Sequence, residues 1–260
     1  MDARREGDRW VLTGTKPWCS LADRLSHALI TAHTTDGSRR LFAVALRGRS
    51  VRVPAGRWVA RGLADVPSGP IELIDCVAVP VGPDGWYLRR PGFAWGGIGV
   101  AACWYGGAVG IARTLREAMC TKTPDQIGTM HLGAVDAALT AARLTLCDAA
   151  FRIDGGRFDQ ARLGDGRFGG SQTSDPRVGV KLADDGSSAA LLAARVRAVV
   201  ARTAEDVISR AGHALGPAPL ALDERHARRV ADLTLYLRQH HAERDDAALG
   251  RAVLELAEWV

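Results

Sequence analysis

Residues 6–20 of the chain read Glu6-Gly-Asp-Arg-Trp-Val-Leu-Thr-Gly-Thr-Lys-Pro-Trp-Cys-Ser20. The first part of this stretch, residues 9–15, is rich in aromatic and β-branched side chains, which favour an extended backbone. Gly14 near its end is typical of a turn or a break in a strand. Residues 9–15 therefore predict a β-strand with a glycine turn.

More strands are predicted on the C-terminal side of this one. Asp36-Gly37 stands between two apolar runs and is a strong signal for a hairpin. Because no helical pattern separates the runs, we expect residues 1–90 to form an antiparallel β-sandwich or barrel module. The further strands are predicted at residues 27–33, 40–47, 51–54 and 71–79.

Helical periodicity begins after Pro91. Residues 126–153, for example, place apolar side chains three or four positions apart, as an amphipathic helix does. Asp223 is placed to cap another helix. We therefore expect an α+β chain with an up-down helical bundle at residues 91–260. Its helices are predicted at residues 93–119, 126–153, 187–212, 223–238 and 241–258, with a mobile loop at 154–186 and a turn at 213–222.

The composition is that of a globular protein. Of the 260 residues, 47% are hydrophobic and 24% are charged, which excludes a disordered or collagen-like chain. The formal net charge is +5, but acidic residues interleave with the arginines and no long basic block occurs. We therefore expect no nucleic-acid partner, and the arginine excess would suit an anionic small molecule.

Cysteine and histidine spacing gives no metal signature. The five cysteines are far apart and form no CxxC pair, which predicts buried thiols in a reducing, cytoplasmic compartment. His240 and His241 are adjacent, and adjacent side chains on a helix point about 100° apart, so the two cannot chelate one ion unaided. We expect no metal site.

One uncharged segment, Gly92–Ala112, is long enough to cross a membrane. Only five of its 21 residues are Leu, Ile, Val or Phe, so its apolarity is weak for a transmembrane helix. A helix in the centre of a bundle is also expected to be apolar on all sides. We therefore predict a buried bundle helix and no membrane span.

Three segments resemble acyl-CoA dehydrogenases. Residues 6–20 are similar to the segment of that family's middle domain in which a hairpin leads into G-x-K-x-W-[IC]-[ST], here Gly14 to Ser20. Residues 71–80 are similar to a later β-segment of the form F-x-D-V-x-V-P, and Gly92-Phe93 together with residues 107–112 match the first helix of the family's C-terminal bundle. The resemblance covers nearly the whole chain, in order, and implies a middle β-barrel domain followed by a helical domain.

The resemblance also implies a function. The family uses FAD to remove two hydrogens from the α and β carbons of an acyl-CoA thioester. Trp18 would lie near the flavin ring, Ser20 would hydrogen-bond to the ring edge, and Cys19 between them would offer its backbone. Gly212 and His213 begin a turn that resembles the glycine-rich turn contacting the adenine half of FAD from a neighbouring subunit.

The catalytic position departs from the family pattern. The family's carboxylate base aligns with His240, and a shifted alignment places Leu237 there instead, so neither alignment supplies a carboxylate. An imidazole can remove a proton because its pKa lies near neutral. Two alternatives stay open beside the dehydrogenase. One is a flavin-dependent monooxygenase of the same fold that uses His240, and the other is a non-catalytic assembly subunit.

The resemblance has further implications for partners. Family members begin with a helical domain and then a strand that touches flavin and substrate, and this sequence starts beyond both. We therefore expect the chain to be incomplete without an N-terminal domain or a partner, and to have an open sheet edge. The resemblance implies an acyl-CoA substrate, an electron-acceptor flavoprotein, and a homodimer, homotetramer or hetero-oligomer with a complementary subunit.

Overall fold

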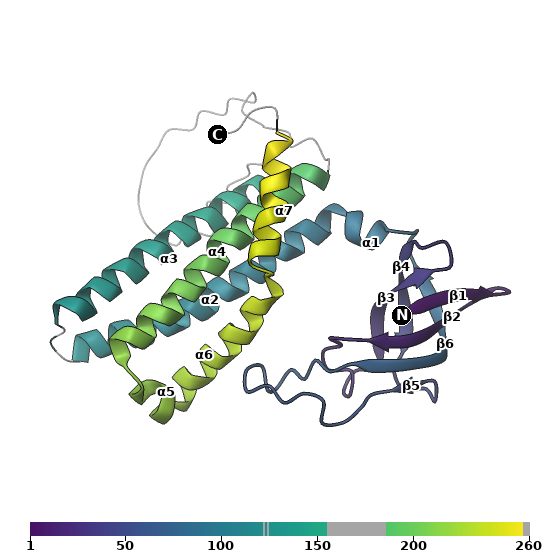
Figure 1. Cartoon of the computed structure of the whole chain (residues 1–260), viewed down its shortest axis with the longest axis horizontal. Coiled ribbons are helices and arrows are strands. Elements are labelled where there is room, and N and C mark those ends of the chain that lie inside the picture. Colours follow the sequence, from purple (N-terminus) through teal and green to yellow (C-terminus); the bar gives the residue numbers. More distant parts are fainter. Residues whose placement is uncertain (122, 124, 155–185, 257–260) are drawn as a thin grey trace. The chain divides into compact units, whose positions relative to one another are not determined.

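The computed structural model describes residues 1–121, 123, 125–154 and 186–256 (Figure 1). The chain divides into two units. The first comprises Met1–Phe93 and Thr234–Tyr236, and the second comprises Ala94–Leu233 and Leu237–Val260. The loop predicted at 154–186 lies, apart from its two ends, outside the described residues.

The first unit contains a closed β-barrel. Its strands are ordered β2-β1-β3-β4-β6, and β6 pairs back onto β2, so that five strands form a ring. The sixth strand, β5, pairs with the first part of β6. The elements of this unit are β1 (Asp2–Glu6), β2 (Arg9–Lys16), β3 (His27–Thr34), β4 (Arg39–Ala45), β5 (Val51–Arg52), β6 (Ile71–Val81) and the short α1 (Trp86–Arg89).

The barrel is mixed rather than antiparallel. β1 runs parallel to β3, with Asp2 opposite His33 and Ala3 opposite Thr34, whereas the other pairs are antiparallel. The prediction of an all-antiparallel module is therefore wrong for this pair. The prediction failed because it did not include β1. The sequence did not indicate this strand, since Ala3 is its only buried residue. The predicted open edge is also wrong, because β1 and β6 flank β2 on both sides.

The barrel interior is filled by aliphatic side chains around one aromatic ring. Leu12, Phe42 and Ile71 are completely buried. The predicted hairpin is confirmed: Gly37 joins β3 to β4 with a φ of +83°, and Asp36 Oδ1 accepts a hydrogen bond of 3.0 Å from the backbone N–H of Ser38. This turn fixes the register of the β3–β4 pair.

The second unit consists of helices. α2 (Pro91–Thr121), α3 (Gln126–Ile153) and α4 (Gly186–Leu215) run alternately up and down, and α3 packs against α4 (Figure 1). α7 also packs against α4. The remaining elements are α5 (Ala218–Leu222), α6 (Glu224–Tyr236), the 3-10 turn η2 (Leu237–Gln239) and α7 (Glu243–Leu254). Asp223 caps α6 as predicted, because its Oδ1 accepts from the N–H of His226 over 3.1 Å.

α2 is buried on one face only. Trp104, Ala108 and Ile111 are completely buried, whereas Gly99 and Gly106 are exposed. The prediction of a helix buried on all sides is therefore wrong, since its apolar character comes largely from Gly and Ala. Residues Gly92–Thr121 form one helix that is long and apolar enough to cross a membrane, and a third of its most apolar window is buried.

Two smaller predictions are also corrected. Cys103, Cys120 and Cys147 are exposed and only Cys76 is fully buried, because the three exposed thiols lie on the outer faces of α2 and α3. The turn predicted from residue 213 begins later, because α4 continues through Leu215 and ends before Gly216, which has a φ of +67°.

Candidate functional site

The segment that follows β2 holds an exposed aromatic ring. Trp18 is 75% exposed and has a φ of +60°, a backbone conformation that is uncommon outside glycine. The next residue keeps this conformation in place, because the Cys19 N–H donates to the carbonyl of Gly69 over 2.9 Å. The indoles of Trp18 and Trp58 meet edge to face, with 6.5 Å between their centroids. The barrel thus presents a large aromatic surface to solvent at one fixed place.

Cys19 makes this backbone contact, and Ser20 follows it. The Oγ atoms of Ser20 and Ser68 are 2.8 Å apart and form a hydrogen bond. Burial raises the pKa of the Cys19 thiol, and the nearby Lys16 opposes this shift. The thiol is therefore protonated at neutral pH, when it is a poor nucleophile.

This surface fits a flavin. An exposed indole offers a flat apolar face to an aromatic ring system, and a neighbouring hydroxyl offers a hydrogen bond to the polar edge of that ring. Trp18 and Ser20 supply these two groups within three residues. The N–H of Cys19 already donates to the carbonyl of Gly69. This segment would therefore offer a ligand the carbonyl of Cys19 rather than its N–H.

His240 lies in the second unit, in a packed aromatic and cationic cluster. Its side chain is only 7% exposed and meets the indole of Trp104 edge-on, with 6.2 Å between ring centroids and 83° between ring planes. The guanidinium carbon of Arg197 lies 4.7 Å from the centroid of the same indole. Arg197 also donates to the carbonyl of Gln239 over 2.9 Å, so the cluster links α2, α4 and the turn before α7.

One hydrogen bond defines the tautomer of His240. The N–H of Ala242 donates to His240 Nδ1 over 3.2 Å, and Nε2 lies 3.9 Å from Asp245 Oδ2. Burial lowers the pKa of His240, while Asp245 opposes this and Arg197 adds to it. The ring is therefore neutral at neutral pH, and its proton sits on Nε2 because Nδ1 accepts. For His240 to accept a proton, the hydrogen bond from Ala242 must open.

Gly212 and His213 lie elsewhere in the second unit, in the last turn of α4. The ring of His213 packs against that of His131 on α3, with centroids 5.8 Å apart. His213 lies sixteen residues after Arg197, which is part of the His240 cluster. Along α4 this corresponds to a rise of about 24 Å. These residues and His240 therefore belong to different parts of the bundle.

The predicted site residues fall into three groups. Trp18, Cys19 and Ser20 are together in the first unit, whereas His240 and the Gly212–His213 pair occupy two places in the second. The sequence did not indicate the neighbours Trp58, Ser68 and Gly69, because they follow 40 to 50 residues later without a regular pattern. The sequence did not indicate Trp104 and Arg197 for the same reason, because both are distant in sequence from His240. Within the described ranges, no three His, Cys, Asp or Glu side chains are grouped to hold a metal ion.

The fold formed by these two units is an acyl-CoA dehydrogenase-like fold. Neither a family model nor a curated protein matches the sequence, and the likeness comes from solved structures. KijD3 in complex with FMN and dTDP-3-amino-2,3,6-trideoxy-4-keto-3-methyl-D-glucose has a TM-score of 0.73 and 21% identity, and the match covers 96% of this chain and 61% of that chain.

Two more structures have the same fold and different activities. An acyl-CoA dehydrogenase from Slackia heliotrinireducens has a TM-score of 0.71 and 16% identity, over 97% of this chain and 62% of that chain. Dibenzothiophene monooxygenase from Paenibacillus sp. A11-2 has a TM-score of 0.72 and 16% identity, over 96% of this chain and 66% of that chain. The chain thus spans less than two thirds of the length of each.

Proposed function

We propose that the chain is a flavin-dependent oxidoreductase that binds FAD. The observation that carries this proposal is the exposed indole of Trp18, held in a left-handed backbone conformation beside the Ser20 hydroxyl. Holding so large an apolar ring in water gives the folded protein no hydrophobic stabilisation. A flat cofactor would cover the ring. KijD3, which has the same fold, is in complex with FMN, and this supports a flavin as the cofactor.

The chain's own groups would orient the cofactor. A bound flavin supplies a two-electron acceptor. Trp18 would stack or pack against its ring and exclude water from one face, and the Ser20 hydroxyl would hydrogen-bond to the ring edge while Ser68 holds that hydroxyl in place. We place the adenine half of FAD at Gly212 and His213 in the second unit of another copy of the chain.

For the reaction we propose α,β-dehydrogenation of an acyl-CoA thioester, with His240 as the group that takes the α proton. A neutral imidazole with a lowered pKa is unprotonated at neutral pH, as a base must be. Its Nδ1 becomes available only when Ala242 moves, so substrate binding would have to break that 3.2 Å hydrogen bond. Arg197 and Trp104 would hold the ring during this change.

Flavin binding is tested by reconstitution. The purified chain is titrated with FAD and with FMN, and bound flavin is followed by its visible absorbance and fluorescence. We expect Trp18→Ala to raise the dissociation constant about tenfold, since aromatic packing contributes roughly 1–1.5 kcal/mol. Trp95→Ala, which removes a 41% exposed indole from α2, is the matched control. A chain that binds neither flavin, or binds equally well without Trp18, contradicts the proposal.

A flavin-dependent monooxygenase is the second candidate, and one observation favours it. The position expected for a carboxylate holds His240, whose Nε2 lies 3.9 Å from Asp245, and dibenzothiophene monooxygenase, which has the same fold, supports the same chemistry. Oxygen uptake that depends on reduced flavin and is lost in His240→Ala, but kept in His241→Ala, would favour this function. Electron transfer to an acceptor protein without oxygen uptake would favour the dehydrogenase.

We also propose that the chain works as a cytoplasmic homodimer or homotetramer. Exposed apolar side chains on α3, among them Ile127, Met130 and Leu144, would be covered by association. Light scattering of the purified chain tests this. A monomer at micromolar concentration, with and without flavin, contradicts it.

A further inference from the structure

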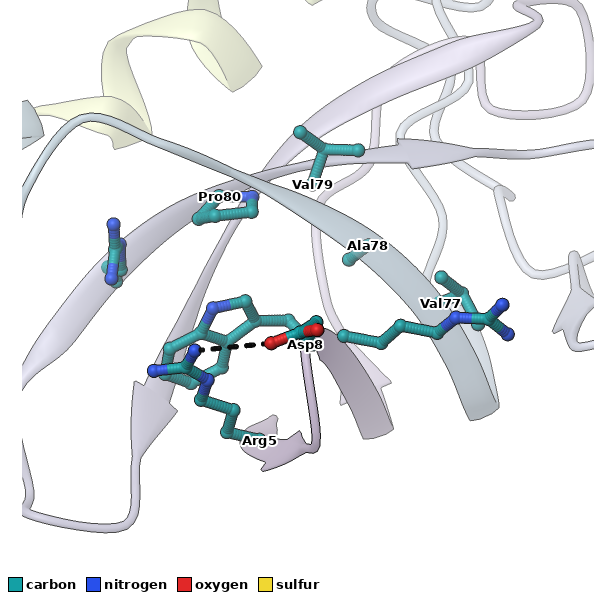
Figure 2. A pocket seen from close by; sticks show the side chains of 9 residues that line it. Arg5, Asp8, Val77, Ala78, Val79 and Pro80 are labelled. Atoms are coloured by element: carbon teal, nitrogen blue, oxygen red, sulfur yellow. Dashed lines mark ion pairs between the residues drawn. The ribbon is translucent and has the colours of Figure 1, made fainter.

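A hollow of about 510 Å³ lies on the wall of the barrel, lined by residues of β1, β2, β4 and β6 and of the turn between β1 and β2. Its size lies within the range of small-molecule sites. Figure 2 shows Val77, Ala78, Val79 and Pro80 following one another along β6, with Arg5 and Asp8 drawn near them on the other side of the hollow. No role in the proposed flavin chemistry uses these residues.

The floor of the hollow is apolar. Val77 is 56% exposed and Val79 is 65% exposed, although both lie in the paired strand β6. Trp10 of β2 lines the same hollow and is supported from below by the ring of Phe42, with 5.4 Å between centroids. Exposed Val side chains beside a Trp ring form a surface that a flat or apolar group would cover.

Three arginines surround this floor. Arg40 is held in place, because its Nε donates to the carbonyl of Gly82 over 3.0 Å and its guanidinium carbon lies 5.5 Å from the centroid of Trp10. Arg5 donates to the carbonyl of Gly7 over 3.0 Å. Arg9 has no ion-pair partner within the part of the chain that the structure describes. The guanidinium groups thus face the hollow from three strands.

Carboxylates neutralise these charges only in part. Asp8 is the one acidic residue lining the hollow, and its fully exposed carboxylate lies 3.9 Å from Arg5, the outer limit of an ion pair (Figure 2). Asp84 lies 3.7 Å from Arg40. Exposed pairs of this kind contribute little free energy and are easily exchanged for a stronger partner. An anion in the hollow would therefore meet an excess of positive charge.

We infer that this hollow binds an organic phosphate with a flat body, such as a nucleoside diphosphate. Guanidinium groups bind phosphate through paired hydrogen bonds, and Arg5, Arg9 and Arg40 all line the hollow. The body of the ligand would lie over Trp10, Val77 and Val79. The site is distinct from Trp18, because β2 runs between them and its eight residues span about 26 Å.

Titration calorimetry with ADP at low salt tests this inference, with adenosine and inorganic phosphate as partial ligands. We expect ADP to bind at least tenfold more tightly than either part. Arg9→Gln and Arg5→Gln should each weaken ADP binding about tenfold, the loss expected for one charge-assisted contact. Arg49→Gln makes the same charge change at an exposed position outside the hollow and should leave binding unchanged.

Two further variants separate this site from others. The ADP binding that Arg9→Gln weakens should persist in His213→Ala, because His213 belongs to the proposed flavin-adenine position and not to the hollow. Val79→Asp should abolish ADP binding without altering the oligomeric state. The inference is overturned if ADP does not bind at millimolar concentration, if it binds Arg9→Gln as well as the unaltered chain, or if Val79→Asp dissociates an oligomer, which would make this face a subunit interface.

Discussion

The guanidinium carbon of Arg197 lies 4.7 Å from the ring centroid of Trp104, a completely buried indole. Arg197 stands on α4 and Trp104 on α2, and the arginine also donates to Gln239 just before His240. One planar cation therefore connects two long helices to the turn that carries the proposed base.

This contact predicts that Arg197 cannot be replaced by lysine. A lysine keeps the charge but loses the planar stacking and the second donor, so we expect Arg197→Lys to lower the free energy of unfolding by about 1–2 kcal/mol. Urea unfolding followed by circular dichroism measures this. Arg195→Lys, two positions earlier on an exposed face of α4, is the control and should change little. Equal stability of the two variants would show that the stacking contributes nothing.

Two buried histidines predict a loss of stability in mild acid. Burial lowers the pKa of both His226 and His240 below the ordinary value of 6.5. The unfolded chain therefore takes up protons first, and the free energy of unfolding falls as the pH drops below about 6.5. Urea midpoints measured from pH 7.5 to 5.5 should decrease, and His226→Gln should flatten this slope. His27→Gln, at an exposed position, should leave the slope unchanged.

Neighbouring glycines on α2 predict opposite effects of the same substitution. A Cβ at Gly106 would meet no atom within 4 Å, whereas a Cβ at Gly107 would lie 3.1 Å from Leu233 Cδ1. Gly106→Ala should raise the free energy of unfolding by about 0.5–1 kcal/mol, because alanine costs less backbone entropy in a helix. Gly107→Ala should be less stable than Gly106→Ala. Thermal unfolding of the two variants gives the comparison, and an equal gain in both would contradict close packing at Leu233.

The barrel core predicts a large cost at Leu12. Its side chain is completely buried in the barrel core, so Leu12→Ala should lower the free energy of unfolding by about 2–5 kcal/mol. Leu29→Ala removes the same atoms from a position that is 65% exposed and should stay within about 0.5 kcal/mol. Tryptophan fluorescence during urea unfolding measures both. Similar losses in the two variants would mean that the interior is not packed around Leu12.

The regular elements could largely be predicted from the sequence, and the misses have physical causes. The run at 126–153 coincides with α3 because its apolar period matches a helix. β1 could not be predicted, since Asp2–Glu6 contains four charged residues and becomes a strand only by hydrogen bonding to β2 and β3. The resemblance implies a turn at Gly212, but a glycine is tolerated inside α4, and the helix ends before Gly216, where φ is positive.

Site residues were predictable only where they adjoin one another in sequence. Trp18 to Ser20 form one short segment, and its resemblance to a known motif was enough to select it. The neighbours of His240 lie about 40 and about 140 positions away along the chain, and no local pattern links Trp104 or Arg197 to it. The tautomer of His240 depends on Ala242, whose unusual φ of +46° no propensity would suggest. Three-dimensional packing alone brings these groups together.

Ring closure through β6 has a consequence for the order in which the chain folds during synthesis. β6 pairs with β2, β4 and β5, so three earlier strands depend on one that is synthesised last. Until residue 81 has left the ribosome, β2 has only β1 beside it and the interior stays open. Because contacts between distant segments form slowly, we expect the apolar interior of the nascent barrel to stay open to aggregation until β6 pairs.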